Sequence, residues 1–368
     1  MKERLIERMA ETAQADAMRN CMQDAEWHAE GDVWTHTLMV CDEVSKLAVW
    51  PTLDDACRFS LMYMALFHDS GKPQTTFLDP ESGRLRSPGH SRVGGAIARS
   101  LLREWDVHLL LREQIVNGVL FHGRPMNVHR YDDPLREVIH TSGMISNALL
   151  YQFALADLRG RIGTGMSEDQ IEYWRLACEE AGCFESPYAF SSEHARLLFY
   201  RGEPTHLGYE PFFEPSCTVY MMAGAPGSGK SRWTEAMHGA LPIVSLDRIR
   251  SQMKIGPDGP QGAVINRGKE ESKEHLRHRQ SFVLDSTNLT RDMRKRWLDL
   301  FYAYNARVEI TYLEAPLPVM LERNARRERQ VPETVIRRLL ERAEPPTVAE
   351  AHCVRVIDSV TQERESGS

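Results

Sequence analysis

The sequence predicts a multidomain protein in which an all-α N-terminal half precedes a C-terminal α/β half with a parallel sheet. Apolar residues recur with helical periodicity from residue 1 to about 200, whereas short apolar strands alternate with helices after residue 216. Between the halves, residues 201–216 break the periodicity with Pro, Gly and aromatic residues. We therefore expect a helical domain at 1–203, a linker at 204–215 and an α/β domain at 216–368.

Composition sets limits on the class of protein. A net charge of −7 argues against a surface coated with nucleic-acid-binding charge, although a local basic patch could still bind a phosphate backbone. The seven cysteines form no CxxC pair, which favours reduced thiols. The first residues predict a charged amphipathic helix rather than a signal peptide, and no apolar run approaches the length of a membrane span. We expect a cytoplasmic protein that does not enter a membrane.

The first predicted helices place histidines on apolar faces or at helix ends. A helix over 33–47 has apolar residues at steps of three and four, with His36 on its buried face. The next helix ends at the adjacent His68 and Asp69, because a glycine and a proline follow closely. Asp69 and Lys72 should therefore emerge at the frayed end of that helix.

Later helices repeat this placement. His90 follows a Pro-Gly pair and opens a helix, and His122 shares an apolar face with the residues before it and ends its helix. Asp157 lies on a further helix, with Arg161 one turn beyond it. Residues 163–200 predict two more helices, the first capped by a serine, and we expect both to support the helical domain.

The placement of these side chains favours metal binding. A single histidine on an apolar face is more often a hydrogen-bonded core residue than a ligand, but a buried aspartate beside a histidine is costly unless a cation lies between them. Imidazole and carboxylate ligands suit Mn, Fe, Co, Ni or Zn better than Ca. The candidate ligands are His36, His68, Asp69, His90, His122 and Asp157.

The order of these residues resembles the HD phosphohydrolase superfamily, an all-helical fold named for its adjacent His and Asp. The resemblance implies one metal held by His36, His68, Asp69 and Asp157, and a second held by His90 and His122 with Asp69 bridging. Two such cations would supply a hydroxide that attacks phosphorus. Lys72 and Arg161 would then bind phosphate charge, the alternative being that both are solvated surface residues.

The α/β half opens on a phosphate-binding loop. The stretch GAPGSGKS, residues 224–231, fits the pattern G-x-x-x-x-G-K-[ST] between a predicted strand and a predicted helix. Its glycines let main-chain N–H groups point at the phosphates of ATP or another NTP, Lys230 adds a positive charge, and Ser231 is placed to bind Mg²⁺. The predicted nucleotide-binding residues are Gly224, Gly227, Ser228, Gly229, Lys230 and Ser231.

Strands and helices alternate after this loop. We expect a short strand that ends at Asp247, a Gly-rich loop over 256–268, a basic helix, and a strand with Asp285 at its carboxyl end. A helix rich in Arg and Trp, a strand over 308–313 and an Arg-dense helix over 322–332 follow. Alternation of this kind implies a parallel sheet whose ligands lie beyond the strand ends.

Residues 216–350 resemble the kinase domain of the polynucleotide kinases. The matching segments are GAPGSGKS, the D-x-x-R of Asp247 and Arg250, VLDSTN, and the R-N-x-x-R that contains Arg323 and Arg327. The resemblance implies that Asp247 is the general base for a 5′-hydroxyl and that Arg250 holds the neighbouring phosphate. Arg323 and Arg327 would clasp the donor phosphates from one helix face, and Asp285 would support Mg²⁺ directly or through water.

Together the halves resemble the bacterial two-domain family that fuses an HD phosphohydrolase to a polynucleotide kinase. The resemblance implies a bifunctional enzyme that phosphorylates 5′-OH ends of RNA or DNA and hydrolyses 2′,3′-cyclic phosphate and 2′-phosphate ends. No nucleotidyl-lysine signature is present, so a separate ligase would join the healed ends. One alternative is a nucleotidase acting on mononucleotides, with the ATP domain as a kinase or sensor. The other is a non-enzymatic, ATP-gated binding module with a structural metal site.

Overall fold

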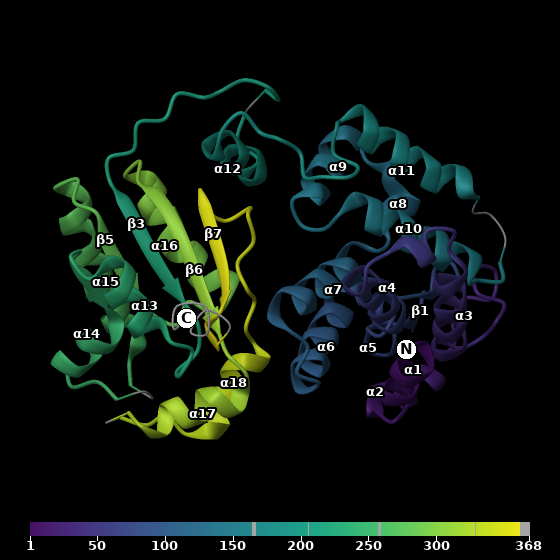
Figure 1. Ribbon diagram of the computed structural model, residues 1–368, viewed down its shortest axis with the longest axis horizontal. Helices are drawn as coiled ribbons and strands as arrows, with labels where there is room; N and C mark the ends of the chain where they lie inside the picture. Colours follow the sequence, from purple (N-terminus) through teal and green to yellow (C-terminus); the bar gives the residue numbers. More distant parts are fainter. Residues whose placement is uncertain (164–166, 205, 257–258, 328, 361–368) are drawn as a thin grey trace. The chain divides into compact units, whose positions relative to one another are not determined.

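The computed structural model describes residues 1–163, 167–204, 206–256, 259–327 and 329–360 (Figure 1). The chain divides into two compact units, Met1–Ala189 and Phe190–Ser368.

The first unit is built mainly from helices. They are α1 (Lys2–Ala10), α2 (Ala13–Arg19), α3 (Val33–Lys46), α4 (Asp55–Phe67), α5 (Lys72–Thr75), α6 (His90–Glu104), α7 (Leu109–Phe121), α8 (Arg124–Asn127), α9 (Pro134–Ser142), α10 (Asn147–Arg159) and α11 (Glu168–Glu180), with 3-10 turns at Trp50–Thr52 and Val128–Arg130. A small antiparallel pair, β1 (Phe77–Leu78) and β2 (Leu85–Arg86), departs from the expected all-α composition. Its strands are too short to show a period of two in the sequence.

Helix α4 lies at the centre of this unit. Every residue from Ser60 to Phe67 is buried, so the helix is covered on all sides, and it packs against α3, α7 and α10. Short polar side chains fix where the surrounding helices begin: Asp32 accepts the N–H of Thr35 ahead of α3, and Ser146 caps α10 in the same way. The ends of these helices then carry the polar residues of the unit.

One local prediction for this unit was wrong. Arg161 does not lie on the helix of Asp157, because α10 ends at Arg159 with Gly160 as its C-cap. Ser167 is the N-cap residue of α11 as expected, but its hydroxyl donates to Asp169 and accepts no main-chain N–H.

The second unit contains a five-stranded sheet in the order β4-β5-β3-β6-β7, and all neighbouring strands are parallel. Its elements are α12 (Glu193–Arg201), β3 (Thr218–Ala223), α13 (Lys230–His238), β4 (Ile243–Ser245), α14 (Leu246–Gln252), α15 (Gln261–Arg277), β5 (Phe282–Asp285), α16 (Arg291–Ala303), β6 (Arg307–Glu314), α17 (Leu317–Ala325), α18 (Glu333–Glu341) and β7 (Cys353–Asp358). The carboxyl ends of all these strands therefore lie along one edge of the sheet.

Helices cover both faces of this sheet. Successive residues of a strand point to opposite faces, and β5 shows both environments. Val283 belongs to an apolar cluster that includes Trp233 of α13, whereas the ring of Phe282 packs on Phe301 of α16 and His275 of α15. This is the layered arrangement expected of parallel α/β proteins.

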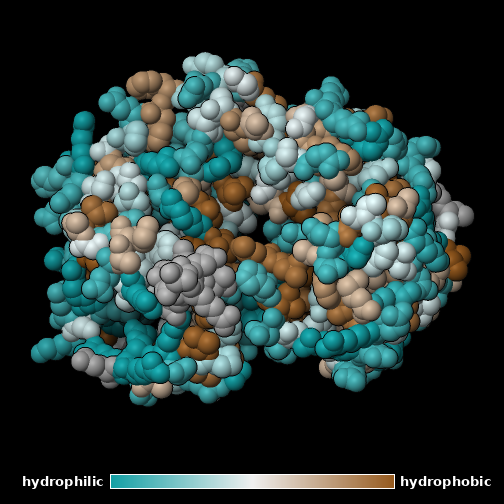
Figure 2. Space-filling view, in the orientation of Figure 1, coloured by the Kyte–Doolittle hydropathy of each residue, from teal (hydrophilic) through white to brown (hydrophobic). Residues whose placement is uncertain are grey.

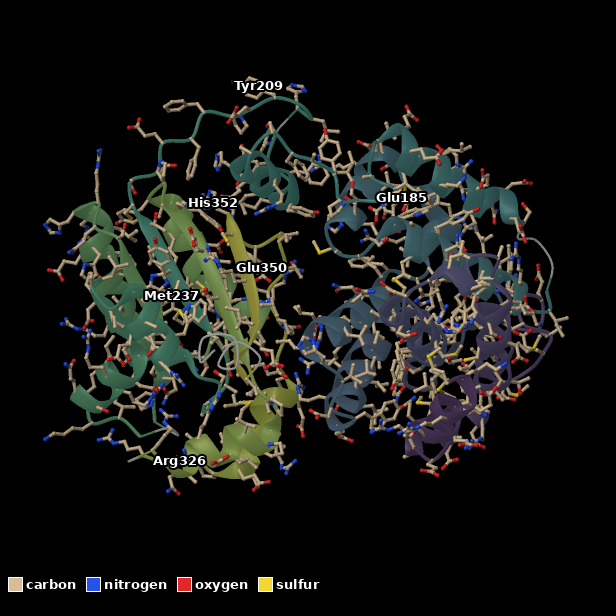
Figure 3. All side chains as sticks on the ribbon, viewed as in Figure 1. Glu185, Tyr209, Met237, Arg326, Glu350 and His352 are labelled. Carbon is tan, nitrogen blue, oxygen red and sulfur yellow. The ribbon has the colours of Figure 1, made fainter. Side chains whose placement is uncertain are left out.

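Helix α12, which the sequence analysis placed in the helical domain, packs against the second unit instead. Glu193 pairs with Arg307 at 2.6 Å, and the ring of His194 stacks on Phe213 at 4.0 Å between centroids. His194 also contacts the buried His352, which precedes β7 together with Glu350 (Figure 3). The division of the chain after Ala189 consequently falls before this helix, not at residue 203.

Other boundaries in the second unit also differ from expectation. Asp247 does not end β4; it lies in the first turn of α14, because Ser245 ends the strand and caps that helix. Part of the expected Gly-rich loop is helical, since α15 begins at Gln261. The Arg-dense helix expected over 322–332 is replaced by α17, which ends at Ala325. Strand β7 was not predicted.

Hydrophilic residues predominate on the face of the molecule drawn in Figure 2, with scattered apolar groups among them. Among the described helices, none combines the length and the hydropathy needed to cross a bilayer.

Candidate active sites

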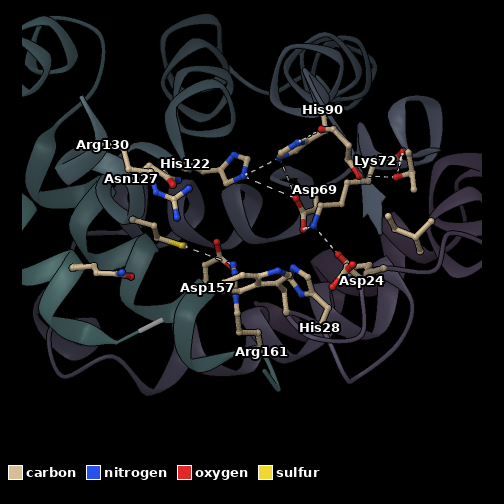
Figure 4. Close-up of a pocket in the computed structure, with 18 residues that line it drawn as sticks. Asp24, His28, Asp69, Lys72, His90, His122, Asn127, Arg130, Asp157 and Arg161 are labelled. Atoms are coloured by element: carbon tan, nitrogen blue, oxygen red, sulfur yellow. Dashed lines mark hydrogen bonds and ion pairs between the residues drawn. The ribbon is translucent and has the colours of Figure 1, made fainter. Parts of the chain in front are cut away.

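The first unit contains a cavity of about 350 Å³ at the ends of several helices (Figure 4). The cavity is lined by predicted site residues and by neighbours that were not predicted. The predicted ones are Asp69, Lys72, His90, His122, Asp157 and Arg161. Those that were not predicted include Gln23, Trp27, His28, Asn127 and Arg130.

Asp69 lies at the centre of the histidine cluster. Its Oδ2 atom is 3.3 Å from His68 Nε2 and 3.8 Å from His36 Nε2, and its Oδ1 atom is 3.4 Å from His90 Nε2 and 3.9 Å from His122 Nε2. The two carboxylate oxygens thus face two different pairs of imidazoles. Two triads with metal-binding spacing share this aspartate: one contains His36 and His68, and the other contains His90 and His122.

Asp157 completes the first of these groups. Its Oδ1 atom is 3.2 Å from His36 Nε2 and 3.9 Å from His68 Nε2. All the residues predicted as ligands are therefore brought together, although they come from α3, α6, α10 and the turns that end α4 and α7. Local sequence could not place them together; the packing of α3, α7 and α10 around α4 does so.

The imidazoles are oriented so that their Nε2 atoms face the cluster. The Nδ1 atoms of His68, His90 and His122 lie 2.9, 2.8 and 2.8 Å from the main-chain carbonyl oxygens of Ala65, Ser87 and Val119. Each Nδ1 must carry a proton to donate to its carbonyl, so each neutral ring presents an unprotonated Nε2 to the cluster.

This orientation is costly without a cation. His90 Nε2 and His122 Nε2 are 3.3 Å apart, so two lone pairs face each other. The buried His68 Nε2 has no hydrogen-bond partner among the described residues. A divalent cation in each of the two groups would satisfy these atoms, and the imidazole and carboxylate donors suit a transition metal. The residues present fit the two metal ions that the sequence implies.

Positive side chains neutralise the buried carboxylates. Lys72 Nζ is 2.6 Å from Asp69 Oδ2, and Arg161 Nη2 is 2.7 Å from Asp157 Oδ1. Burial alone would raise the pKa of Asp69 and of Asp157, but the charges of Lys72 and Arg161 respectively, together with the nearby histidines, hold both pKa values well below the usual range. Lys72 and Arg161 also line the cavity, so neither is merely a solvated surface charge.

In His122, burial determines the charge state of the side chain. Burial lowers its pKa to about 3, helped by the charges of His90 and His68, so the ring is neutral at ordinary pH. A neutral ring is the form that binds a metal.

Sequence reasoning missed Glu30 and His28, which lie in the loop before α3. Glu30 Oε1 is 2.9 Å from His28 Nδ1 and 2.8 Å from His36 Nδ1, and these three residues form a third group with metal-binding spacing. Both residues lie in a turn, in which the N–H of Gly31 donates to the carbonyl oxygen of His28, so neither a helical nor a strand period marked them in the sequence.

The second unit holds the phosphate-binding loop at the carboxyl end of β3. Gly224, Gly227 and Gly229 all have positive φ, at 141°, 82° and 98°. A Cβ atom on Gly224 or Gly227 would lie 2.4 or 2.3 Å from a main-chain oxygen, of Leu313 and Met320 respectively. Only glycine fits these positions, and the loop leads directly into the N-terminus of α13.

Polar groups of this loop point inward. Lys230 Nζ donates to the carbonyl oxygens of Gly224 and Ala225, at 2.6 and 3.2 Å. The buried Ser228 Oγ has no hydrogen-bond partner among the described residues. Ser231 lies in the first turn of α13 and is exposed. The loop therefore presents donors at a helix N-terminus, as a site for phosphate requires.

Acidic residues predicted for the kinase reaction interact electrostatically with Lys230. Burial lowers the pKa of Lys230, and the negative charges of Asp285 and Asp247 oppose this. Burial raises the pKa of Asp285, and Lys230 opposes that. Asp285 ends β5, while the Asp247 side chain is 76% exposed and pairs with Arg250. The Asp247 side chain is thus accessible to solvent.

The predicted arginines separate into two environments. Arg323, in the last turn of α17, donates to Ser359 Oγ at 2.8 Å, and its Nη1 lies 3.5 Å from the carbonyl oxygen of Gly227 in the loop. Arg327 lies beyond the end of that helix and is exposed, so the two do not share a helix face. Its charge nevertheless affects the pKa of both Lys230 and Asp285.

Among known protein families, a model described as an AAA domain matches residues 219–346, which lie in the second unit. The L-seryl-tRNA(Sec) kinase of Methanococcus maripaludis is 24% identical over 135 residues, which are 35% of this chain and 53% of that protein. The CC-adding tRNA nucleotidyltransferase of Thermus thermophilus is 45% identical over 69 residues, 19% of this chain and 14% of that protein. The chain thus spans about half of one curated relative and much less of the other.

Among solved structures, a gluconokinase from Sinorhizobium meliloti 1021 is similar with a TM-score of 0.29 and 20% identity, and the match covers 39% of this chain and 84% of that one. That likeness is too weak to carry an argument. The match to the AAA-domain model, together with the parallel sheet, makes the second unit a P-loop kinase-like α/β domain. A domain of this kind implies ATP and Mg²⁺ as cofactors. The first unit is helical and carries a His/Asp cluster able to bind metal.

Proposed function

We propose that this chain is a bifunctional enzyme that repairs nucleic-acid ends. The second unit phosphorylates 5′-OH ends with ATP or another NTP, and the first unit hydrolyses 2′,3′-cyclic phosphates and 2′-phosphates with the help of two divalent transition metals. The observation that carries the proposal is the position of Asp69 between two pairs of Nε2 atoms. Dinuclear sites bridged in this way are suited to phosphoester hydrolysis.

In the hydrolytic site, His36, His68, Asp69 and Asp157 would hold one metal, and His90 and His122 would hold the other with Asp69. The two ions would supply a hydroxide nucleophile at neutral pH and neutralise phosphate charge. Lys72 and Arg161 bind the non-bridging oxygens of the phosphate, because both line the cavity and carry charged donors. Arg130, at the same cavity, adds a third cationic side chain that favours an anionic substrate.

In the kinase site, the main chain of residues 224–231 and Lys230 hold the donor phosphates. Lys230 now donates to carbonyls of its own loop, so it would turn toward the phosphates when nucleotide binds. Asp247 accepts the proton of the acceptor hydroxyl, and Arg250 beside it holds the adjacent phosphate. Arg323 and Arg327 neutralise charge on the transferred group, and Ser231 and Asp285 would hold Mg²⁺.

RNA is the favoured substrate. The two curated relatives described above carry tRNA in their names, and cyclic phosphate ends are a product of RNA cleavage. The rival is a nucleotidase acting on mononucleotides, because a cavity of about 350 Å³ has room for one nucleotide. Ends healed by the proposed enzyme would carry a 5′-phosphate and free 2′- and 3′-hydroxyls, ready for a separate ligase.

One substrate tests both activities. An RNA oligonucleotide with a 5′-OH and a 2′,3′-cyclic phosphate should gain a 5′-phosphate and lose its terminal phosphate. Asp69→Ala should abolish the hydrolysis and keep the kinase activity, whereas Lys230→Ala should do the reverse. Loss of both activities in either variant would contradict two separate sites. Preference for a mononucleotide over the oligonucleotide at both sites would favour the rival.

A further inference from the structure

The Glu30 carboxylate is held without contributing an oxygen to the Asp69 cluster. Its side chain is only 1% exposed. One oxygen, Oε1, lies 2.8 Å from His36 Nδ1 and 2.9 Å from His28 Nδ1, and the other accepts the N–H of Ile162 at 2.9 Å. The contact with His36 is an ion-pair contact at short range, because His36 Nδ1 makes no aligned hydrogen bond among the described residues.

His36 differs in this respect from the other imidazoles of the cluster. His68 and His122 follow the ends of α4 and α7, where main-chain carbonyls lack helical partners and can accept from Nδ1. His36 lies inside α3, where the nearby carbonyls already belong to the helix; that of Asp32 accepts the N–H of His36 itself. Its Nδ1 therefore needs a partner from another segment, and Glu30 provides a charged one.

A charged partner changes the ligand. The negative charge of a carboxylate beside Nδ1 keeps the proton of the imidazole on that nitrogen, and it makes the opposite nitrogen a stronger base toward metal. That opposite nitrogen, His36 Nε2, faces Asp157 Oδ1 at 3.2 Å and Asp69 Oδ2 at 3.8 Å. Neutral carbonyls beside His68, His90 and His122 give the same orientation with a weaker effect on basicity.

Glu30 is itself fixed by the segment that carries Arg161. The N–H of Ala29 donates to the carbonyl of Ile162 at 2.6 Å, and the N–H of Ile162 donates to the Glu30 carboxylate. The loop before α3 and the residue after Arg161 are thus joined in both directions. Displacement of Glu30 would disturb the His36 side chain directly, and through Ile162 it would disturb the main chain at Arg161.

We propose, on the basis of the metal-dependent function proposed above, that Glu30 is a positioning residue that acts through His36 to tighten metal binding at the Asp69–Asp157 side of the cluster. His28, whose Nδ1 donates to the same oxygen, holds Glu30 in place.

Cobalt titration of the full-length protein without nucleotide tests this role. Glu30→Gln removes the charge but keeps the shape, and it should weaken the binding of one of two Co²⁺ ions about 10- to 100-fold, seen in the visible absorption of the bound metal. Glu26→Gln is the matched control: Glu26 belongs to the same loop, is exposed and pairs with Arg84, and its variant should bind Co²⁺ like the wild type. An unchanged affinity in Glu30→Gln would overturn the assignment.

A double-mutant cycle shows whether the effect passes through His36. In a His36→Ala background, Glu30→Gln should weaken Co²⁺ binding no further. Equal weakening in both backgrounds would mean that Glu30 does not act through His36. Thermal unfolding shows whether each variant is folded. If Glu30→Gln does not fold, Glu30→Asp is used in the same titration, because it keeps the buried charge on a shorter side chain. The wild-type protein could bind both Co²⁺ ions and yet fail to hydrolyse a cyclic phosphate. That result would overturn the proposed function but would not contradict the role of Glu30 in metal binding.

Discussion

His90 Nε2 and His122 Nε2 face each other across 3.3 Å, while each ring is anchored through Nδ1 to a main-chain carbonyl. Neither Nε2 can donate to the other when both rings are neutral. The pair is therefore stable only with a cation or a proton between the rings, and burial makes the charged form of His122 costly. We infer that the second metal ion would bind between these two rings.

Added metal should stabilise the helical unit. Mn²⁺ or Co²⁺ at 100 times its Kd would stabilise the folded state by roughly 2.7 kcal/mol, since binding favours the folded state. Thermal unfolding with and without metal measures the gain. His122→Ala should reduce it, whereas the exposed His129 does not face the cluster and His129→Ala should keep it. If metal stabilised both variants equally, the metal would have to bind away from His122.

Gly227→Ala should inactivate the kinase and spare hydrolysis. The new Cβ atom would meet the carbonyl oxygen of Met320 at 2.3 Å, and the φ of 82° adds strain of about 1–3 kcal/mol. The loop must then open and lose its hold on the phosphates. Gly256→Ala is the control, because no atom lies within 4 Å of its added Cβ. ATP affinity and transfer to a 5′-OH oligonucleotide are measured for both variants; a fully active Gly227→Ala would refute this account of the loop.

Asp247→Asn should affect the chemical step alone. The exposed side chain contributes little to packing, so ATP binding and thermal stability should be unchanged, while kcat for phosphate transfer should fall roughly 10²- to 10⁴-fold. Asp299→Asn, another exposed aspartate paired with a basic residue, serves as the control and should keep its activity. A large rise in the KM for ATP, with kcat retained, would assign Asp247 to nucleotide binding instead.

Acid should weaken the second unit through His352. Its Nδ1 accepts the N–H of Val308 at 3.1 Å, and its Nε2 lies 3.2 Å from His194 Nδ1, so a second proton has no acceptor. Burial lowers the pKa of His352 to about 3, helped by the charges of His194 and nearby arginines. The unfolded chain takes up this proton near pH 6.5 and the folded one only near pH 3, so stability is full above pH 6.5 and falls as the pH drops between these values.

The loss should approach about 1.4 kcal/mol per pH unit in that window. Hydrogen exchange of peptides from β6, compared at pH 7 and pH 5 after correction for intrinsic rates, measures it. His352→Gln should show a smaller dependence on pH than the wild type, while the exposed His278→Gln should behave like the wild type. Identical slopes for wild type and His352→Gln would show that another group carries the acid response.

Much of the architecture follows from the sequence because it is encoded locally. Helical periodicity located the helix of His36, and the Pro-Gly pair located the start of the helix at His90. The glycine spacing located the phosphate loop between β3 and α13. The second unit has the predicted parallel sheet, which the matching family model supports.

What escaped prediction depends on contacts distant in sequence. Strand β7 has no fully buried residue and pairs only with β6, so its apolar pattern was weak. Helix α12 continues the helical periodicity of the residues before it, and its place in the second unit depends on contacts with Arg307 and Phe213, which lie later in the chain. Glu30 lies in an acidic loop that composition alone marks as exposed; its burial follows from contacts with His36 and Ile162.

Anomalous diffraction from crystals grown with Co²⁺ or Mn²⁺ tests the central claim most directly. Two peaks should appear in the first unit, one on each side of the Asp69 carboxylate, with His36, His68 and Asp157 around one and His90 and His122 around the other. A single peak away from Asp69, or none within reach of these side chains, would contradict the dinuclear site.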